Sequence, residues 1–321
     1  MNNTETDPKL IEQLKKLEEK YEAMGQDLSS YLDGLLYSDY LKYWDYIHLE
    51  TLLSLQNPKT GFKDEIIFIC YHQITELYFK LILWEMEQIV TEEDISATSL
   101  IKKQKRINNY FHQLVHSFTV MTDGMDHDEF LKFRMALLPA SGFQSAQYRL
   151  IEIYATDLNN LVHVDFKDEL ANESNIQLLY DQIYWKQGAN ELASGKKTLT
   201  LTHFEEKYSA SFIQKAYELR KSNLWQIFKA KMQDDPEKET LIEVLRSFDL
   251  LANVNWPLAH YKSAVRYLHK KPEDIKATGG SNWQKYLPPR FQKIMFYPEL
   301  WSEEELKNWG KTWVDKEVFG K

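Results

Sequence analysis

Cysteine is almost absent from this chain, because Cys70 is the only one among 321 residues. A single thiol forms no disulfide within the chain and builds no cysteine-ligated zinc or iron–sulfur site. Glycine and proline are also scarce, with 11 and 9 residues. Since both residues break helices, their scarcity together with long stretches of helical periodicity predicts a mostly helical protein.

The sequence also lacks an excess of positive charge. Its 48 Asp and Glu residues outnumber its 39 Lys and Arg residues, and charges of both signs are interspersed. This balance argues against nucleic acid and an anionic membrane surface as partners. The polar N-terminus has no signal-peptide core, and the most apolar run, residues 66–84, contains polar and charged side chains that lipid tolerates poorly. We therefore expect a soluble, cytoplasmic protein without a membrane-spanning segment.

Aromatic residues are plentiful, with 9 Trp, 19 Tyr and 16 Phe, and apolar residues recur at helical spacing along most of the chain. This periodicity predicts helices over residues 8–33, 64–90, 97–121, 209–231 and 236–269. A break is expected at Asp33-Gly34, and Pro257 should kink or interrupt the last of these helices. Ser302 and Glu305 form a capping box, which predicts a short final helix.

Neither an internal repeat nor a low-complexity linker divides the chain, and its length allows a sizeable core. The simplest organisation is a single all-α domain over residues 1–321. Residues 1–35 would form an N-terminal helical arm, and residues 165–235 a helical excursion from the main bundle.

Several common catalytic patterns are missing. Residues 188–198, GANELASGKKT, resemble a phosphate-binding loop, but the glycine spacing is wrong and Lys197 occupies the position of the required Ser or Thr. No Glu is followed by His three positions later, as a di-iron site in a helical bundle requires. The Gly-x-Ser-x-Gly motif of serine hydrolases is also absent.

Two histidines lie in strongly apolar helical stretches. His72 shares a predicted helix face with Phe68 and Glu76. It is either a core histidine whose ring nitrogens are satisfied by neighbours, or an adjustable donor and acceptor in a cavity wall. His260 is followed one turn later by Ala264, which leaves room beside the imidazole for a flat cofactor. Haem is the flat cofactor that requires one axial histidine, although a packed histidine would explain the same pattern.

An arginine, Arg134, occupies a third apolar stretch, just before a Pro-Ala-Ser-Gly break. A buried guanidinium is costly unless it meets a carboxylate, which it binds with two parallel hydrogen bonds. That carboxylate belongs either to the protein or to a substrate. Residues 278–281, TGGS, would offer amides and hydroxyls to a charged ligand, or simply form a flexible connection.

Taken together and in this order, these segments resemble the tryptophan 2,3-dioxygenase family. The similarity begins with YWDYIHLETLLSLQ (43–56) and DEIIFICYHQITELYFK (64–80). It continues with FRMALLPASGFQSAQYRLIE (133–152), which matches the family pattern almost throughout. RSFDLLANVNWPLAHYKSAVRYL (246–268) and TGGS (278–281) are similar to the family's haem-ligand helix and substrate loop. The resemblance implies an all-α helical bundle that encloses a b-type haem.

The resemblance also implies roles for individual residues. His72 would be the distal histidine that hydrogen-bonds the indole N–H of the substrate, and Phe68 and Phe130 would be walls of the indole pocket. His260 would be the axial ligand of the haem iron. Arg134 would pair with the substrate carboxylate, while Glu76 would anchor its helix.

Five further positions acquire roles in the same way. Thr278 would contact the ammonium or carboxylate group of the substrate, and Ser141 would lie near the haem or its propionates. Tyr43, Tyr46 and Ile47 match residues that, in this family, reach the pocket of a neighbouring subunit. The family therefore implies a homotetramer built as a dimer of dimers.

The implied reaction uses ferrous haem b (Fe2+), L-tryptophan and O2. Both oxygen atoms are inserted across the indole C2–C3 bond, which opens the ring and gives N-formylkynurenine, the first step of tryptophan catabolism by the kynurenine pathway. Two alternatives remain: a haem enzyme of the same superfamily that acts on another indole or aromatic amino acid, and a helical protein that binds haem or tryptophan without turnover.

The chain departs from the family pattern around its last two motifs. Ala277 replaces the first glycine of the loop, and Asn282-Trp283 replace the usual Ser-Gly. Residues 270–273 form an insert, and Pro257 lies unexpectedly close to His260. These differences fall on the loop expected to cover the substrate and on the helix expected to bind haem.

Overall fold

A computed structural model describes residues 7–38, 42–137, 142–190, 196–268 and 289–310. Its described parts are helices and connecting loops, with two isolated antiparallel bridges and no strand. The predicted all-α fold class is therefore confirmed. The chain separates into two compact units, Met1–Gln56 and Asn57–Lys321. The predicted arm at 1–35 and excursion at 165–235 remain predictions.

The first unit holds four helices, in which no residue is buried. Their bounds are α1 Pro8–Ala23, α2 Leu28–Leu36, α3 Tyr43–Tyr46 and α4 Leu49–Leu53. The helix expected over 8–33 ends instead at Gly25, whose φ of +66° is accessible to glycine. In this conformation the N–H groups of Gly25 and Gln26 bond back to the last carbonyls of α1. The expected break at Asp33-Gly34 is wrong, because both residues lie within α2.

The second unit is built from long helices joined by short ones. Its α-helices are α5 Glu65–Thr91, α6 Ala97–Ser117, α7 Thr119–Thr122, α8 His127–Phe133, α9 Ala146–Ala155, α10 Ile176–Asp181, α11 Tyr184–Gly188, α12 Leu199–Leu219, α13 Leu224–Lys231, α14 Lys238–Leu250, α15 Trp256–Leu268, α17 Pro289–Gln292 and α18 Glu303–Lys307. Short 3-10 turns are η1 Arg134–Leu137, η2 Gly142–Gln144, η3 Leu158–Leu161, η4 Val164–Phe166 and η6 Pro298–Leu300. The predicted capping box of Ser302 and Glu305 opens α18.

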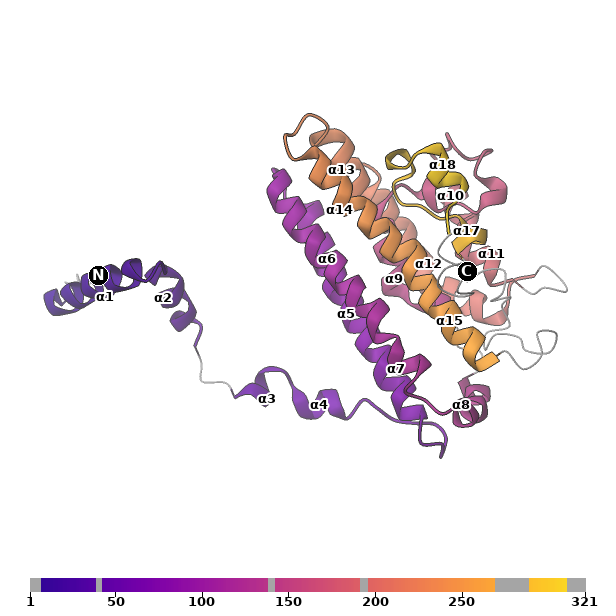
Figure 1. Ribbon diagram of the computed structural model, residues 1–321, viewed down its shortest axis with the longest axis horizontal. Coiled ribbons are helices and arrows are strands. Elements are labelled where there is room, and N and C mark those ends of the chain that lie inside the picture. The colour runs from indigo at the N-terminus through magenta and orange to yellow at the C-terminus, as the bar shows by residue number, and fades with distance from the viewer. Residues whose placement is uncertain (1–6, 39–41, 138–141, 191–195, 269–288, 311–321) are drawn as a thin grey trace. The chain divides into compact units, whose positions relative to one another are not determined.

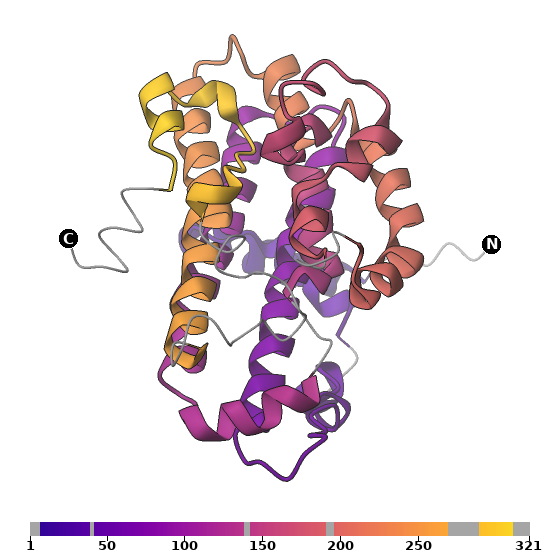
Figure 2. The same ribbon diagram turned by 90° about the vertical axis from the view of Figure 1, so that its right-hand side faces the viewer.

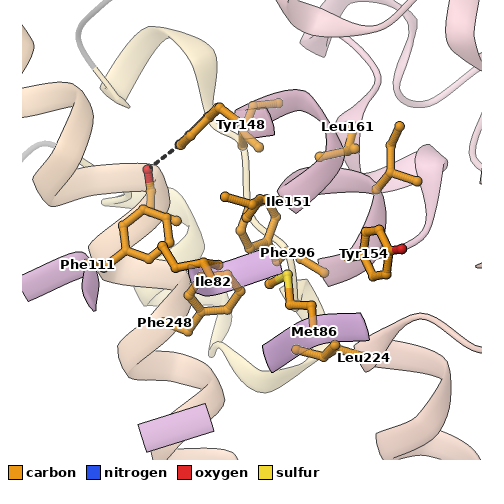
Figure 3. Packing of buried hydrophobic residues seen from close by; sticks show 14 of the residues in the cluster. Ile82, Met86, Phe111, Tyr148, Ile151, Tyr154, Leu161, Leu224, Phe248 and Phe296 are labelled. Carbon is orange, nitrogen blue, oxygen red and sulfur yellow. Dashed lines mark hydrogen bonds between the residues drawn. The ribbon is translucent and has the colours of Figure 1, made fainter. Parts of the chain in front are cut away.

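Helix α5 packs along α6 and α9, and α14 packs along α6 (Figures 1 and 2). Side chains from all four helices meet in the hydrophobic core (Figure 3). The residues that show this packing are Ile82 and Met86 of α5, Phe111 of α6, Ile151 of α9 and Phe248 of α14. Burial of such side chains is the main stabilising contribution to a helical bundle.

By length and composition alone, α5 is a helix that could cross a membrane. One such helix is weak evidence, because the central helix of a bundle passes the same test. Here α5 also buries Thr75 and the carboxylates of Glu65 and Glu85. Glu65 accepts the N–H groups of Lys59 and Thr60, and Glu85 forms a two-bond pair with Arg106. These residues lie on the face of α5 that packs against the protein, while the opposite face stays exposed.

The long helix expected over residues 236–269 is interrupted as predicted. Helix α14 ends at Leu250, a π-helical turn η5 covers Leu251–Asn255, and α15 begins at Trp256. Pro257, which has no N–H to donate, occupies the second position of α15. The interruption therefore widens the helix by one residue for a single turn.

Candidate functional site

His72 lies in the first half of α5, where its ring hydrogen-bonds the preceding helical turn. Nδ1 lies 2.7 Å from the carbonyl oxygen of Phe68. Because a carbonyl oxygen only accepts, Nδ1 carries the proton, and Nε2 of the neutral ring keeps a lone pair. Desolvation by the surrounding protein lowers the pKa of His72, against smaller opposing contributions from the Phe68 carbonyl and Glu76. The neutral ring can thus accept a hydrogen bond at Nε2.

His72 combines this desolvation with exposure to solvent. Its lowered pKa reflects the protein atoms packed around it, although part of the ring stays accessible to solvent. Aromatic rings form its surroundings. The ring centroid of Phe68 lies 4.0 Å from that of His72, and the ring of Tyr71 lies 5.9 Å away.

Helix α8 adds further rings to this aromatic group. Phe130 and Phe133 lie 6.5 Å and 5.8 Å from Phe68, measured between ring centroids. Phe130 also lies 4.6 Å from Tyr267 of α15, whose hydroxyl donates to the carbonyl of Met121 at 2.5 Å. The structure therefore places Phe68, His72 and Phe130 in one aromatic group.

Arg134 follows immediately on α8, at the start of η1. The N-cap residue of α8, Asp126, accepts the N–H groups of Asp128 and Glu129 and thereby fixes the start of this short helix. At the other end Arg134 is only 8% exposed, and desolvation lowers its pKa. A guanidinium in this setting favours a strong interaction with a carboxylate.

His260 lies in α15, between two aromatic rings. The rings of Phe118 and Trp256 lie 4.6 Å and 4.5 Å from the imidazole, both in edge-on orientations. Nδ1 lies 3.2 Å from the carbonyl oxygen of Trp256, so it again carries the proton and leaves the lone pair on Nε2. Burial lowers the pKa of His260 to about 4, against an opposing contribution from its hydrogen bond to the Trp256 carbonyl. The neutral ring can therefore offer Nε2 as a ligand.

This donor arrangement fits a haem. A metal-binding imidazole must be neutral, and its other nitrogen is usually held by a hydrogen bond to a carbonyl or carboxylate. His260 meets both requirements. Among the residues described, no group of three or more His, Cys, Asp or Glu side chains could hold a metal ion.

The other predicted residues lie outside the described residues or in the first unit. Ser141 and Thr278 lie outside the described residues, as do Ala277, the insert at 270–273 and Asn282-Trp283. Tyr43, Tyr46 and Ile47 belong to the first unit, where the two tyrosine side chains are exposed.

Two residues near the site were missed from the sequence. Phe118 precedes α7 and packs on His260, although nothing in its own segment indicates this distant contact. Gln147 of α9 donates to both the backbone carbonyl and the side-chain carboxylate of Glu76, each at 2.8 Å. The contact agrees with the expected role of Glu76 in anchoring its helix. The position of Gln147 within the family-like segment 133–152 was the available indication.

Comparisons with known proteins point in one direction. A family model described as tryptophan 2,3-dioxygenase matches residues 30–270. A tryptophan 2,3-dioxygenase of Ruegeria sp. (strain TM1040) is 30% identical over 282 residues, covering 83% of this chain and 92% of the relative. The enzyme of the same name from Polaromonas naphthalenivorans (strain CJ2) is 28% identical over 275 residues, covering 83% and 91%. That of Geobacillus thermodenitrificans (strain NG80-2) is 27% identical over 278 residues, covering 83% and 92%.

Proposed function

Because the chain belongs to the tryptophan 2,3-dioxygenase family, we propose that it opens the indole ring of L-tryptophan with O2 to give N-formylkynurenine. The observation that carries this proposal is the pair of imidazoles on α5 and α15. In each ring Nδ1 donates to the carbonyl one turn earlier, so Nε2 keeps its lone pair, and burial lowers the pKa of both. One ring is suited to bind a metal centre, and the other to accept a hydrogen bond from a substrate next to it.

His260 is the proposed axial ligand of haem b, through Nε2. Its hydrogen bond to the Trp256 carbonyl fixes the tautomer, and Phe118 and Trp256 limit the rotation of the ring. When bound, haem in its ferrous state supplies the iron centre at which dioxygen is activated. Ser141 is proposed to lie near the haem or its propionates.

His72 is proposed to orient the substrate by accepting the indole N–H at Nε2. This is the nitrogen that its bond to the Phe68 carbonyl leaves free of a proton. Phe68 and Phe130 would form walls for the indole ring, where stacking and edge contacts between aromatic rings are favourable. The protein's main contribution is then orientation of the substrate in a pocket that excludes bulk water.

Arg134 is proposed to bind the carboxylate of L-tryptophan. Its burial makes a bidentate pair with a carboxylate stronger than the same pair in water. Thr278 is proposed to contact the ammonium or carboxylate group from the other side. Two contacts at one end and His72 at the other would fix the position of the indole edge.

We further propose that the active form is a homotetramer, a dimer of dimers, located in the cytoplasm. Apolar side chains on α5, namely Ile74, Leu77, Leu81 and Trp84, are exposed at the three- and four-residue spacing of a helix–helix seam. Exposed apolar faces of this kind favour association. Tyr43, Tyr46 and Ile47 would complete the pocket of a neighbouring subunit. Sedimentation equilibrium is expected to give four times the chain mass, and a monomer would contradict this assembly.

The decisive experiment mixes ferrous, haem-loaded protein with L-tryptophan in air and follows N-formylkynurenine by absorbance. We expect product from the wild-type chain, and neither product nor stable haem binding from a His260→Ala variant. Haem binding without product would reject L-tryptophan turnover while leaving the haem site in place. Product formation by the His260→Ala variant would reject the assigned ligand.

A further inference from the structure

The π-helical turn before α15 leaves one buried backbone carbonyl without a helical partner. In this turn the N–H of Trp256 donates to the carbonyl of Leu251, five residues earlier. In an α-helix that N–H would have served Ala252, four residues earlier. The next possible donor to Ala252 is residue 257, which is proline and has no N–H. The carbonyl of Ala252 therefore depends on a partner outside its own helix.

Tyr148 of α9 provides that partner. Its hydroxyl donates to the Ala252 carbonyl at 2.9 Å, and both residues are buried. A buried carbonyl without a hydrogen-bond partner destabilises the folded protein by about as much as a lost hydrogen bond does. The bond therefore stabilises the widened turn, in which the Ala252 carbonyl would otherwise lack a donor.

The register of this turn controls the peptide that orients His260. Trp256 donates its N–H into the π turn and offers its carbonyl to Nδ1 of His260. Its indole ring is held by Phe118 at 5.3 Å and by Phe79 at 6.0 Å, and Phe79 in turn contacts Tyr148 at 5.4 Å. A shift in the π turn would thus move both the carbonyl that holds the imidazole and the ring that packs beside it.

We propose that Tyr148 is a positioning residue for His260: its hydroxyl fixes the π turn at Leu251–Asn255, and the turn sets the direction of the imidazole. This inference rests on the proposed function, because it takes His260 to be the axial ligand of haem. Pro257 has no N–H with which to extend the π register to the Ala252 carbonyl.

The test compares Tyr148→Phe with Tyr180→Phe in the full-length, haem-loaded protein. Tyr180 is a matched control, because it is also buried and its hydroxyl makes a hydrogen bond, 3.1 Å from Oγ of Ser209, away from the histidines. Haem loss to a scavenging apoprotein should be about 5- to 10-fold faster for Tyr148→Phe, the change expected from one lost hydrogen bond, and unchanged for Tyr180→Phe. Resonance Raman spectra of the ferrous protein should show a shifted or broadened iron–histidine stretch only for Tyr148→Phe.

A second variant tests the carbonyl itself. Pro257→Ala restores an N–H that reaches the Ala252 carbonyl only in the π register, since its α-helical acceptor is Asn253. Recovery of haem retention on adding this change to Tyr148→Phe would place the effect at the Ala252 carbonyl. Wild-type haem retention in Tyr148→Phe, or the same acceleration in Tyr180→Phe, would overturn the proposal.

A readout without haem separates this inference from the proposed function. In the haem-free chain, amide hydrogen exchange over residues 251–260 should be faster in Tyr148→Phe and normal in Tyr180→Phe. If the wild-type chain bound no haem, the proposed function would fail, and exchange would still decide whether Tyr148 fixes the turn. Unchanged exchange in Tyr148→Phe would overturn the positioning role.

Discussion

Helices α5 and α15 each carry a histidine whose Nδ1 donates to the carbonyl one turn earlier, at 2.7 Å for His72 and 3.2 Å for His260. The helices themselves differ. Helix α5 runs without interruption for 27 residues, whereas α15 follows a π turn and has proline at its second position. The same local bond therefore gives both rings the same tautomer, while the surrounding structure determines how firmly each ring is held.

The surroundings of His72 and His260 suit the two rings to different roles. His72 is accessible to solvent, and desolvation lowers its pKa against smaller opposing contributions from the Phe68 carbonyl and Glu76. His260 is half-buried between two aromatic rings, and its pKa is lowered to about 4 by burial. An accessible acceptor suits a substrate that enters and leaves, and a rigid, neutral ring suits a permanent ligand. Helix α9 supports both helices, through Gln147 to α5 and Tyr148 to the π turn.

The sharpest test of this division removes Arg134, on the substrate side. Arg134→Ala should weaken binding of L-tryptophan by about 2–5 kcal/mol, because it removes one partner of a desolvated charge pair. Haem retention through His260 should be unchanged. Calorimetric titration with tryptamine, which lacks the carboxylate, provides the control, since its affinity should hardly change. Equal losses for L-tryptophan and tryptamine would show that Arg134 supports the fold rather than the carboxylate.

The next largest effect is expected on the haem side, at Asp249 of α14. This buried carboxylate accepts the N–H groups of Phe296 and Tyr297, the indole N–H of Trp301 and the side-chain amide of Asn253. Asp249→Asn replaces one acceptor oxygen with an NH2 group that faces these donors. The free energy of unfolding in urea should fall by about 2–4 kcal/mol.

A half-exposed carboxylate with similar partners gives the matched control for Asp249. Asp157 accepts side-chain amides of Asn223 and Gln226, and its side chain is 23% exposed. Because water can replace lost partners there, Asp157→Asn should reduce stability by about 1 kcal/mol or less. Equal losses in the free energy of unfolding for the two variants would show that the burial of Asp249 does not determine how much it contributes to stability.

The two helices also differ in how far the sequence predicts them. Helix α5 was expected over residues 64–90 and lies at Glu65–Thr91, because its apolar periodicity is a local property of the chain. Pro257 predicted an interruption near His260, but not its form. Whether a proline produces a kink, a break or a π turn depends on the donors available to the carbonyls that it leaves unpaired. Here the deciding group is the hydroxyl of Tyr148, which is distant in sequence.

The same distinction applies to the site. Phe68, His72, Phe130 and Arg134 were identified from apolar patterning and from the family resemblance, and they lie close together or on adjacent elements. Phe118 was missed, because its contact with His260 joins segments that no sequence spacing relates. The predicted break at Asp33-Gly34 is wrong because the chain breaks earlier, at Gly25. A new helix, α2, then begins after Asp27 and runs through both residues.

A smaller effect should appear in helix α9, which supports both sides. Burial raises the pKa of Glu152 to about 6, despite the opposing charge of Arg149 and the hydrogen bond from Tyr184. The folded protein therefore holds this proton more tightly than the unfolded chain. The resulting stabilisation is fully present below the ordinary pKa near 4.5 and is lost as the pH rises through about 6.

This difference amounts to at most about 2 kcal/mol. It is measured as the gap in the free energy of unfolding between wild type and Glu152→Gln, a variant that keeps an acceptor for Tyr184 but does not titrate. The wild type should lose stability relative to Glu152→Gln between pH 4.5 and 6. A constant gap over this range would show that the pair with Arg149 keeps the carboxylate ionised.

The smallest effect should come from His72 itself, and it tests the task assigned to α5. His72→Ala removes one hydrogen bond to the indole N–H, which should cost about 1 kcal/mol of transition-state stabilisation. The kcat/KM for L-tryptophan should therefore fall roughly 5-fold. Haem retention should stay normal, in contrast to His260→Ala.

Tryptophan methylated at the indole nitrogen has no N–H to donate, so its kcat/KM should not fall in the same variant. His112→Ala, an exposed position on α6, should leave both substrates unaffected. If both substrates lost activity equally in His72→Ala, the ring would act by shaping the pocket, and Nε2 would not be the substrate's acceptor.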